Sequence, residues 1–204
     1  MFVAADAGPV RIPQQERSRV TQLRLLDATV DCLIEYGWSG TTTTLVAQRA
    51  GVSRGAQLHH YPTKAALVLA AVAHLATRRA QEIRAEAAAL PVRGLDRAVE
   101  LLAAAFTGPL YAAALEVWVA ARTDPALRAA LVPLEARVGR ELHHLAVDLF
   151  GADETRPRVR EAVQATLDLL RGLGVANLLS DDSARRRAIL TVWTGELAQV
   201  LGSG

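Results

Sequence analysis

Apolar residues recur at intervals of three and four along most of this chain, the spacing that places side chains on one face of an α-helix. The pattern first appears over residues 17–36 and ends at Gly37. Glycines, prolines and short polar runs then separate further predicted helices at residues 63–90, 95–107, 110–123, 125–150, 158–179 and 183–201. Because no sustained alternating β-branched run occurs, the sequence predicts an all-α protein.

Two short helices are predicted between residues 41 and 64. Thr42 is a natural N-cap for the first, Gly51 can end it in the left-handed conformation, and Ser53 can cap the second. The apolar contacts are expected from Leu45, Ala47, Val52 and Leu58, with Arg54, Gln57, His59 and His60 left on the polar face. This is a helix-turn-helix, whose second helix suits the major groove of DNA.

The charge distribution supports the same interpretation. Although the chain carries a net charge of only +2, the segment between Tyr36 and Gln81 has no acidic residue. It holds four arginines and Lys64, so its formal charge is +5. A positive field confined to one end of a protein attracts phosphates and steers association with nucleic acid.

The run from Gly37 to Lys64 resembles the N-terminal domain of TetR-family repressors. The resemblance is carried by Gly37, Trp38, Gly40 and Thr41, by the run Ala50-Gly51-Val52-Ser53-Arg54-Gly55, and by His60, Tyr61 and Lys64. It implies a flexible arm over residues 1–15, a three-helix helix-turn-helix DNA-binding domain over 16–62, and a helical effector-binding and dimerisation domain over 63–204. The sequence departs from the family at Gln57 and Leu58, where Leu-Tyr is common.

The residues expected to contact DNA lie in and around the two short helices. They are Thr42, Thr43, Ser53, Arg54, Ala56, Gln57, His59, His60 and Lys64. Gln57 is predicted to lie exposed and to read an adenine through two hydrogen bonds. Lys64, one position after a predicted Thr63 N-cap, is predicted to meet a phosphate.

The resemblance also implies a small-molecule effector in the second domain, and an apolar cluster around Gly108-Pro109 is the candidate site. Its residues are Phe106, Tyr111, Leu115, Trp118 and Arg122. Such residues usually form plain core, so a packed interior is the competing interpretation. Any effector is expected to be a small apolar or amphipathic molecule, with helix 63–90 transmitting its effect to the DNA-binding end.

The last two predicted helices carry more apolar residues than a terminal hairpin needs. These residues are Leu167, Leu170, Val175, Leu178, Leu179, Ile189, Leu190, Val192, Trp193, Leu197, Val200 and Leu201. Packing within one subunit could absorb them. The resemblance favours a homodimer through these helices on a palindromic double-stranded operator, with Gly172 and Gly174 permitting close helix approach.

Other functions have weaker signals. Residues 51–55 match the G-x-S-x-G elbow of serine hydrolases, with Ser53 as nucleophile, but the elbow needs a preceding strand. Glu141 and His144 form only half of a di-iron motif, and His59 and His60 diverge on a helix. We therefore expect a regulator rather than an enzyme, with no metal or other cofactor. The longest apolar run, residues 65–73, is too short to span a bilayer, and a cytoplasmic location is expected.

Overall fold

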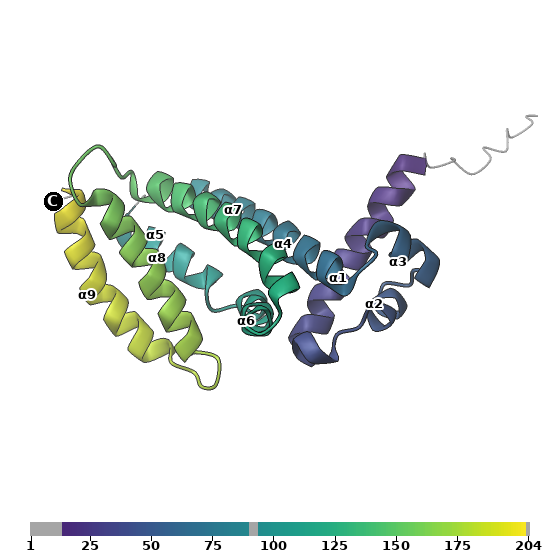
Figure 1. Cartoon of the computed structure of the whole chain (residues 1–204). Coiled ribbons are helices and arrows are strands. Elements are labelled where there is room, and N and C mark those ends of the chain that lie inside the picture. The colour runs from purple at the N-terminus through teal and green to yellow at the C-terminus, as the bar shows by residue number, and fades with distance from the viewer. Residues whose placement is uncertain (1–13, 90–93, 203–204) are drawn as a thin grey trace, which may run out of the picture.

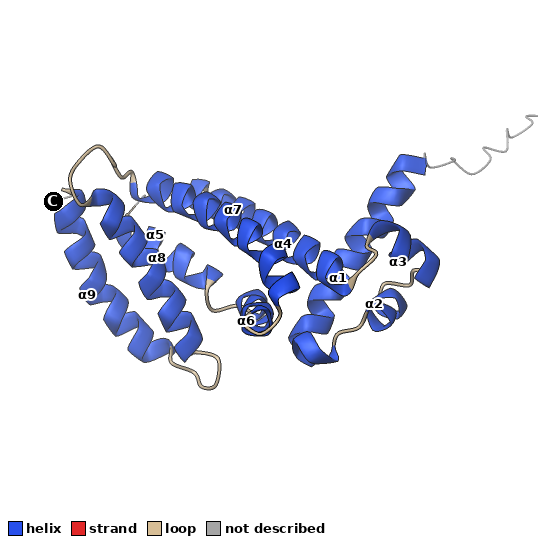
Figure 2. Cartoon of the chain, in the orientation of Figure 1, coloured by secondary structure: helices blue, strands red, loops and turns tan. Residues whose placement is uncertain are grey.

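The computed structural model describes residues 14–89 and 94–202. Within these residues all regular secondary structure is α-helical (Figure 2), which confirms the all-α prediction. Three helices form a head at one end of the molecule, and α8 and α9 lie side by side at the other end (Figure 1). The helices are α1 (Gln14–Gly40), α2 (Thr43–Arg49), α3 (Arg54–His60), α4 (Lys64–Ala88), α5 (Leu95–Ala105), α6 (Pro109–Ala121), α7 (Pro125–Phe150), α8 (Val159–Ala176) and α9 (Ser183–Leu201).

Local signals account for most helix ends. The Asp124 carboxylate accepts the Leu127 backbone N–H at 3.0 Å, which caps α7 where the sequence predicted its start. Helix α1 begins at Gln14 rather than near residue 17, so the last residues of the predicted arm are helical; the rest of the arm lies outside the described residues. Gly37 interrupts α1 with a φ of 63°, as predicted, and a single further turn follows it.

The buried apolar residues form three clusters, and α4 contributes to all of them. The head cluster is Leu25, Ala28, Cys32, Val46 and Leu67. The junction cluster joins the head to the rest and consists of Leu33, Val68, Val72, Ala113, Val117, Ala121, Leu127, Leu131 and Leu134. The body cluster includes Ile83 of α4 and fills the space among α5, α7, α8 and α9. Helix α4 therefore runs as one element from the head into the body.

Polar contacts to Trp38 also hold the head against the body. The Trp38 backbone N–H donates to the Glu116 carboxylate of α6 at 3.3 Å. The Lys64 ammonium at the start of α4 donates to the Trp38 carbonyl and lies 4.2 Å from the centre of its indole ring. Gly37 has a φ of 63°, so the left-handed backbone before Trp38 favours glycine, and a Cβ there would also lie 2.9 Å from the Glu116 carboxylate.

The apolar residues of α8 and α9 divide between the interior and the surface. Leu167, Leu170, Leu190, Leu197 and Leu201 are buried in the body cluster, whereas Val175, Leu178, Leu179 and Val192 are exposed. Gly174 is also buried, and it packs against the backbone of Phe106. The expectation that Gly174 faces a partner helix is therefore wrong, while Gly172 is exposed.

Candidate DNA-binding surface and effector cavity

Helices α2 and α3 form the predicted helix-turn-helix. The Thr42 hydroxyl accepts the Leu45 N–H at 3.1 Å, and the Ser53 hydroxyl accepts the Ala56 N–H at 3.2 Å. Between them Gly51 adopts a φ of 63°, which lets the chain reverse at the end of α2. Each hydroxyl keeps its own proton to donate, so both N-caps can still bond to phosphate.

The residues predicted to contact DNA differ in exposure. Thr42, Ser53, Arg54 and His59 are exposed; Thr43, Ala56, His60 and Lys64 are half-buried; Gln57 is buried. Apart from Gln57, all of them can be reached from outside the head, and their contacts with DNA stay predictions.

The expected orientation of α3 is wrong at two adjacent positions. Gln57 is fully buried, and its amide nitrogen donates to the Tyr61 carbonyl at 2.6 Å. Leu58, expected in the core, is 44% exposed. The physical reason is that the Gln57 side chain points into the head and bonds to the carbonyl at the C-terminal end of α3. Leu58, the next residue on the helix, therefore points to the outer surface. The premise for Gln57 as a base-reading residue is therefore wrong.

Lys64 has a structural role that the sequence did not reveal. Its ammonium is bound to the Trp38 carbonyl and indole, and partial burial lowers the pKa of this amine. The phosphate contact stays a prediction, because an ammonium has three donors and one is used here.

The basic segment is less polarised in space than along the chain. Arg49 pairs with Glu35 at 2.5 Å, Arg78 with Asp27 at 3.6 Å, and Arg79 with Glu86 at 3.1 Å. These acids come from α1 and from the second half of α4, outside the basic segment. Among the ion pairs of residues 14–89 and 94–202, none involves Arg54. Arg54 thus provides an exposed cation at the start of α3, and Arg17, Arg19 and Arg24 of α1 are exposed in the head as well.

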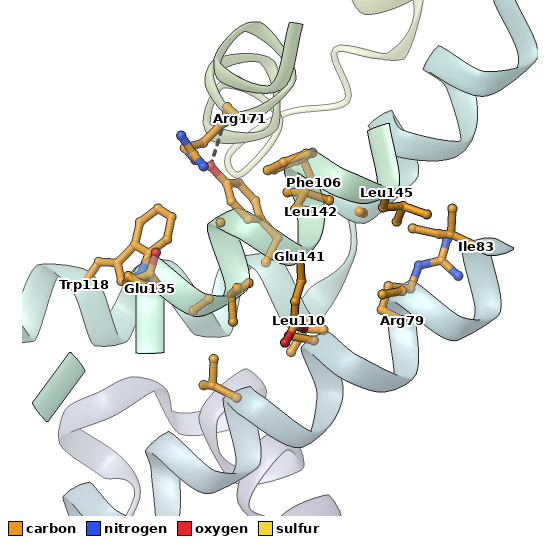
Figure 3. Close-up of a pocket in the computed structure, with 18 residues that line it drawn as sticks. Arg79, Ile83, Phe106, Leu110, Trp118, Glu135, Glu141, Leu142, Leu145 and Arg171 are labelled. Carbon is orange, nitrogen blue, oxygen red and sulfur yellow. Dashed lines mark hydrogen bonds between the residues drawn. The ribbon is translucent and has the colours of Figure 1, made fainter. Parts of the chain in front are cut away.

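A cavity of about 150 Å³ lies in the body among α4, α6, α7 and α8 (Figure 3). Trp118 and Glu135 lie at one end of it, and Ile83 and Arg79 at the other. Most of its lining is apolar: Val72, Ala76, Ala80, Ile83, Ala105, Phe106, Leu110, Ala114, Val138, Gly139, Leu142 and Leu145, with the Tyr111 and Trp118 rings. A few polar groups in a mostly apolar hollow are typical of small-molecule sites.

Hydrogen bonds fix the aromatic end of the cavity. The Trp118 indole N–H donates to Glu135 at 2.6 Å, and the Tyr111 hydroxyl donates to the Arg171 carbonyl of α8 at 2.8 Å. The rings of Phe106 and Tyr111 meet edge to face with centres 5.4 Å apart. The Arg171 guanidinium lies 5.8 Å from the Trp118 ring centre. These side chains form a rigid wall, because each is held by at least one directional contact.

Three of the five predicted effector residues line this cavity. Phe106, Tyr111 and Trp118 do so. Leu115 packs against the body cluster instead, and the exposed Arg122 lines a shallower neighbouring hollow that shares Trp118, Glu135 and Arg171 with the cavity. The sequence missed the walls from α4, α7 and α8, whose charged members are Arg79, Glu135, Glu141 and Arg171.

Glu135 should make the stability of the protein depend on pH. Burial raises the pKa of its carboxyl above the ordinary value, although the Trp118 hydrogen bond and the Arg171 charge oppose this. A raised pKa in the folded state stabilises the protein at low pH, and this contribution is lost as the pH rises through the raised value. We expect Glu135→Gln, which resembles the protonated form, to raise the melting temperature at neutral pH but not in acid.

The control is Glu141→Gln, which removes an exposed carboxylate from the same helix. Melting temperatures measured across the acid-to-neutral range give the difference between each variant and the original protein. A difference for Glu135→Gln that stays constant over this range would contradict the expectation.

Alternative functions find little support. Ser53 caps α3, no strand precedes it in the described residues, and so the hydrolase elbow has no structural basis. No group of three or more metal-ligating side chains occurs in the part of the chain that the structure describes. No single described helix is long and apolar enough to cross a membrane; α5 and α6 together would be, but they are bent by 54° and supply buried residues to the core.

The helical head with an exposed recognition helix, and a body with a mostly apolar cavity, define the class of helix-turn-helix regulators. The profile of the bacterial regulatory proteins of the tetR family matches residues 25–71. The HTH-type transcriptional regulator CymR of Pseudomonas putida is 34% identical over 188 residues, which cover 87% of this chain and 89% of CymR. The chain belongs to the TetR family and is a transcriptional regulator.

Solved structures agree with the fold. A protein from Mesorhizobium loti assigned to the TetR family has a TM-score of 0.71 at 16% identity, covering 90% of this chain and 98% of its own. The multidrug binding protein EbrR in complex with ethidium has a TM-score of 0.61 at 24% identity, covering 85% of this chain and 97% of EbrR.

Proposed function

We propose that this protein is a cytoplasmic repressor that binds a palindromic operator as a homodimer and releases it when a small molecule enters the cavity. In this proposal residues 16–62 bind DNA, and residues 63–204 bind the effector and the second subunit. One observation carries it: α4 begins next to the recognition helix and also forms a wall of the cavity, through Val72, Ala76, Arg79, Ala80 and Ile83.

Two helices, α4 and α6, connect the cavity to the head and can transmit the effect of a bound molecule. Helix α4 places Leu67 in the head cluster, and Lys64 at its start is bound to Trp38. Helix α6 carries Tyr111 and Trp118 of the cavity wall and binds the Trp38 N–H through Glu116. A molecule that separates α4 from α6 would therefore displace both supports of the head. Such a displacement changes the spacing of the two heads in a dimer, which must match the half-sites of an operator.

The size of the cavity limits the effector. A dry apolar cavity of roughly this volume can hold a benzene-sized molecule. The aromatic wall and the nearby Glu135 and Arg171 favour a single-ring molecule with one polar group, unless the cavity expands on binding. EbrR, which shares the fold, is described in complexes with ethidium and proflavin, which supports ligand entry into a body of this kind.

The dimer surface proposed for α8 and α9 rests on their exposed residues. Val175, Leu178 and Val192 are exposed, and Leu179 is 98% exposed in the turn between the helices. A Cβ added to Gly172 or Gly195 would have no neighbour within 4 Å. Glycine in a helix costs about 1 kcal/mol relative to alanine, so a function that favours glycine at these two positions would offset this cost. Close approach of a partner's helices is one such function.

Val192→Arg should convert the dimer into a monomer, because it places a charge on this apolar surface. The matched control is Val132→Arg, at a residue that is 57% exposed on α7, compared with 71% for Val192. Light scattering after size-exclusion chromatography measures the mass of each variant, and circular dichroism checks its folding. A dimeric Val192→Arg protein would place the subunit contact elsewhere.

Selection of bound sequences from random double-stranded DNA tests the proposed function directly. We expect an inverted repeat, because a two-fold symmetric dimer presents two equivalent recognition helices. Arg54→Ala should weaken binding to the selected sequence and reduce its salt dependence, since Arg54 is the exposed cation on α3. Failure to enrich any sequence would refute operator binding, and enrichment of a single unrepeated site would refute the symmetric dimer.

A further inference from the structure

The recognition helix buries a polar side chain and exposes an apolar one next to it. Gln57 is 0% exposed, and its amide oxygen is buried without a hydrogen-bond partner. Leu58 is 44% exposed. A buried unpaired oxygen is unfavourable, and so is an exposed leucine that could have been buried. The packing of Gln57 sets the orientation of α3, but it does not explain why the outer position is occupied by leucine rather than by a polar residue.

The neighbours of Leu58 place it on the side of α3 that faces outward. Arg54, Gly55, Leu58 and His59 are the exposed residues of this helix. Residues four apart lie above one another on a helix, so Arg54 and Leu58 share one face and lie roughly 6 Å apart along the axis. Arg54 is an exposed cation on that face. A helix presented to DNA by Arg54 thus presents Leu58 as well.

Leucine can make only one kind of contact with DNA that distinguishes sequences. It has no donor or acceptor, so it cannot bond to a phosphate or to the polar edge of a base. In the major groove, the C5 methyl group of thymine is the apolar feature of the base edges. The DNA group best suited to contact an exposed leucine on a recognition helix is therefore a thymine methyl group.

We propose that Leu58 is a specificity-determining residue that recognises one thymine in each operator half-site through its C5 methyl group. This inference rests on the proposed DNA binding of the head. The thymine lies within about one to two base pairs of the position nearest Arg54, because side chains three to four residues apart on a recognition helix contact neighbouring bases.

The experiment uses the full-length protein and the sequence obtained from random selection. Each thymine is replaced in turn by deoxyuridine, which removes the methyl group and changes no hydrogen-bonding group. At one thymine per half-site the original protein should lose about fourfold in affinity, the value expected for one buried carbon. The symmetric double replacement should cost about 15-fold.

Leu58→Ala is the protein change in a double-mutant cycle whose DNA change is the replacement of thymine by deoxyuridine. This variant should bind the thymine and deoxyuridine operators equally, because the contact is already lost. Its salt dependence should equal that of the original protein, since no phosphate contact has changed. His59→Ala, an exposed neighbour on the same helix, should keep the sensitivity to deoxyuridine. The melting temperature of Leu58→Ala verifies that the head is folded.

Two results would overturn the inference while leaving operator binding intact. One is a Leu58→Ala protein that remains as sensitive as the original to every deoxyuridine replacement. The other is a selected operator in which no thymine replacement affects the original protein. If no DNA sequence is selected at all, the proposed function itself fails and the inference fails with it.

Discussion

Replacing Gly174 with alanine should lower the free energy of unfolding by about 1 to 3 kcal/mol or more, the usual cost of overpacking a core. Gly174 lies where α8 passes closest to the turn between α5 and α6. A Cβ there would lie 2.1 Å from the Phe106 carbonyl oxygen and 2.8 Å from the Tyr111 ring. The Phe106 oxygen belongs to the backbone, and the Tyr111 hydroxyl is bonded to the Arg171 carbonyl, so neither neighbour can move aside easily.

The control for this change is Gly139→Ala in α7. A Cβ at Gly139 has no neighbour within 4 Å, so this alanine should raise the stability by roughly 0.5 to 1 kcal/mol through its better helix propensity. Chemical denaturation of both variants, without effector, gives the two free energies. Equal stabilities would mean that α8 does not approach the Phe106 backbone as closely as described.

Gln57→Ala should destabilise the head by about 2 to 4 kcal/mol, as expected for a truncated buried side chain and a lost buried hydrogen bond. The Gln57 amide donates to the Tyr61 carbonyl at 2.6 Å, and Tyr61 is the C-cap of α3. Alanine would leave both an empty space and an unpaired carbonyl. Hydrogen exchange of the α3 amides, together with thermal melting, measures the loss.

Gln57→Met separates the packing role from base recognition. Methionine keeps most of the volume and removes the amide oxygen that has no partner, so this variant should be clearly more stable than Gln57→Ala. Its preferred DNA sequence should equal that of the original protein, because a buried residue contacts no base. A changed preference at one base pair would show that Gln57 turns outward on DNA.

The helix-turn-helix could be predicted from sequence because its signals are local. Thr42, Gly51 and Ser53 each act on backbone groups within a few residues, and the structure places all three as predicted. The orientation of α3 could not be obtained in this way. Helix α3 has only seven residues, which include too few apolar side chains to show which face is buried. The burial of Gln57 also depends on its hydrogen bond to the Tyr61 carbonyl, which lies beyond the end of the helix.

The cavity was only partly predictable for a related reason. Tyr111 and Trp118 are seven apart and lie on one face of α6, so their association follows from helical spacing. Periodicity shows that a face is buried, but it does not show which helices cover it. The contributions of Arg79, Glu135 and Arg171 come from three other helices, and only the tertiary packing of those helices places them around one space.

The Trp38 contacts bear on how such proteins diversify. Glu116 and Lys64 bind the N–H and the carbonyl of residue 38, which every amino acid except proline provides. The Trp38 side chain adds two further contacts, because the Lys64 ammonium stacks on the indole and the indole packs against the junction cluster. The body therefore contacts both the backbone at the end of α1 and the Trp38 side chain. A body of this kind can accept heads with different recognition helices, provided that the joint keeps the glycine and the large apolar residue after it, so that operator preference and effector response can evolve separately.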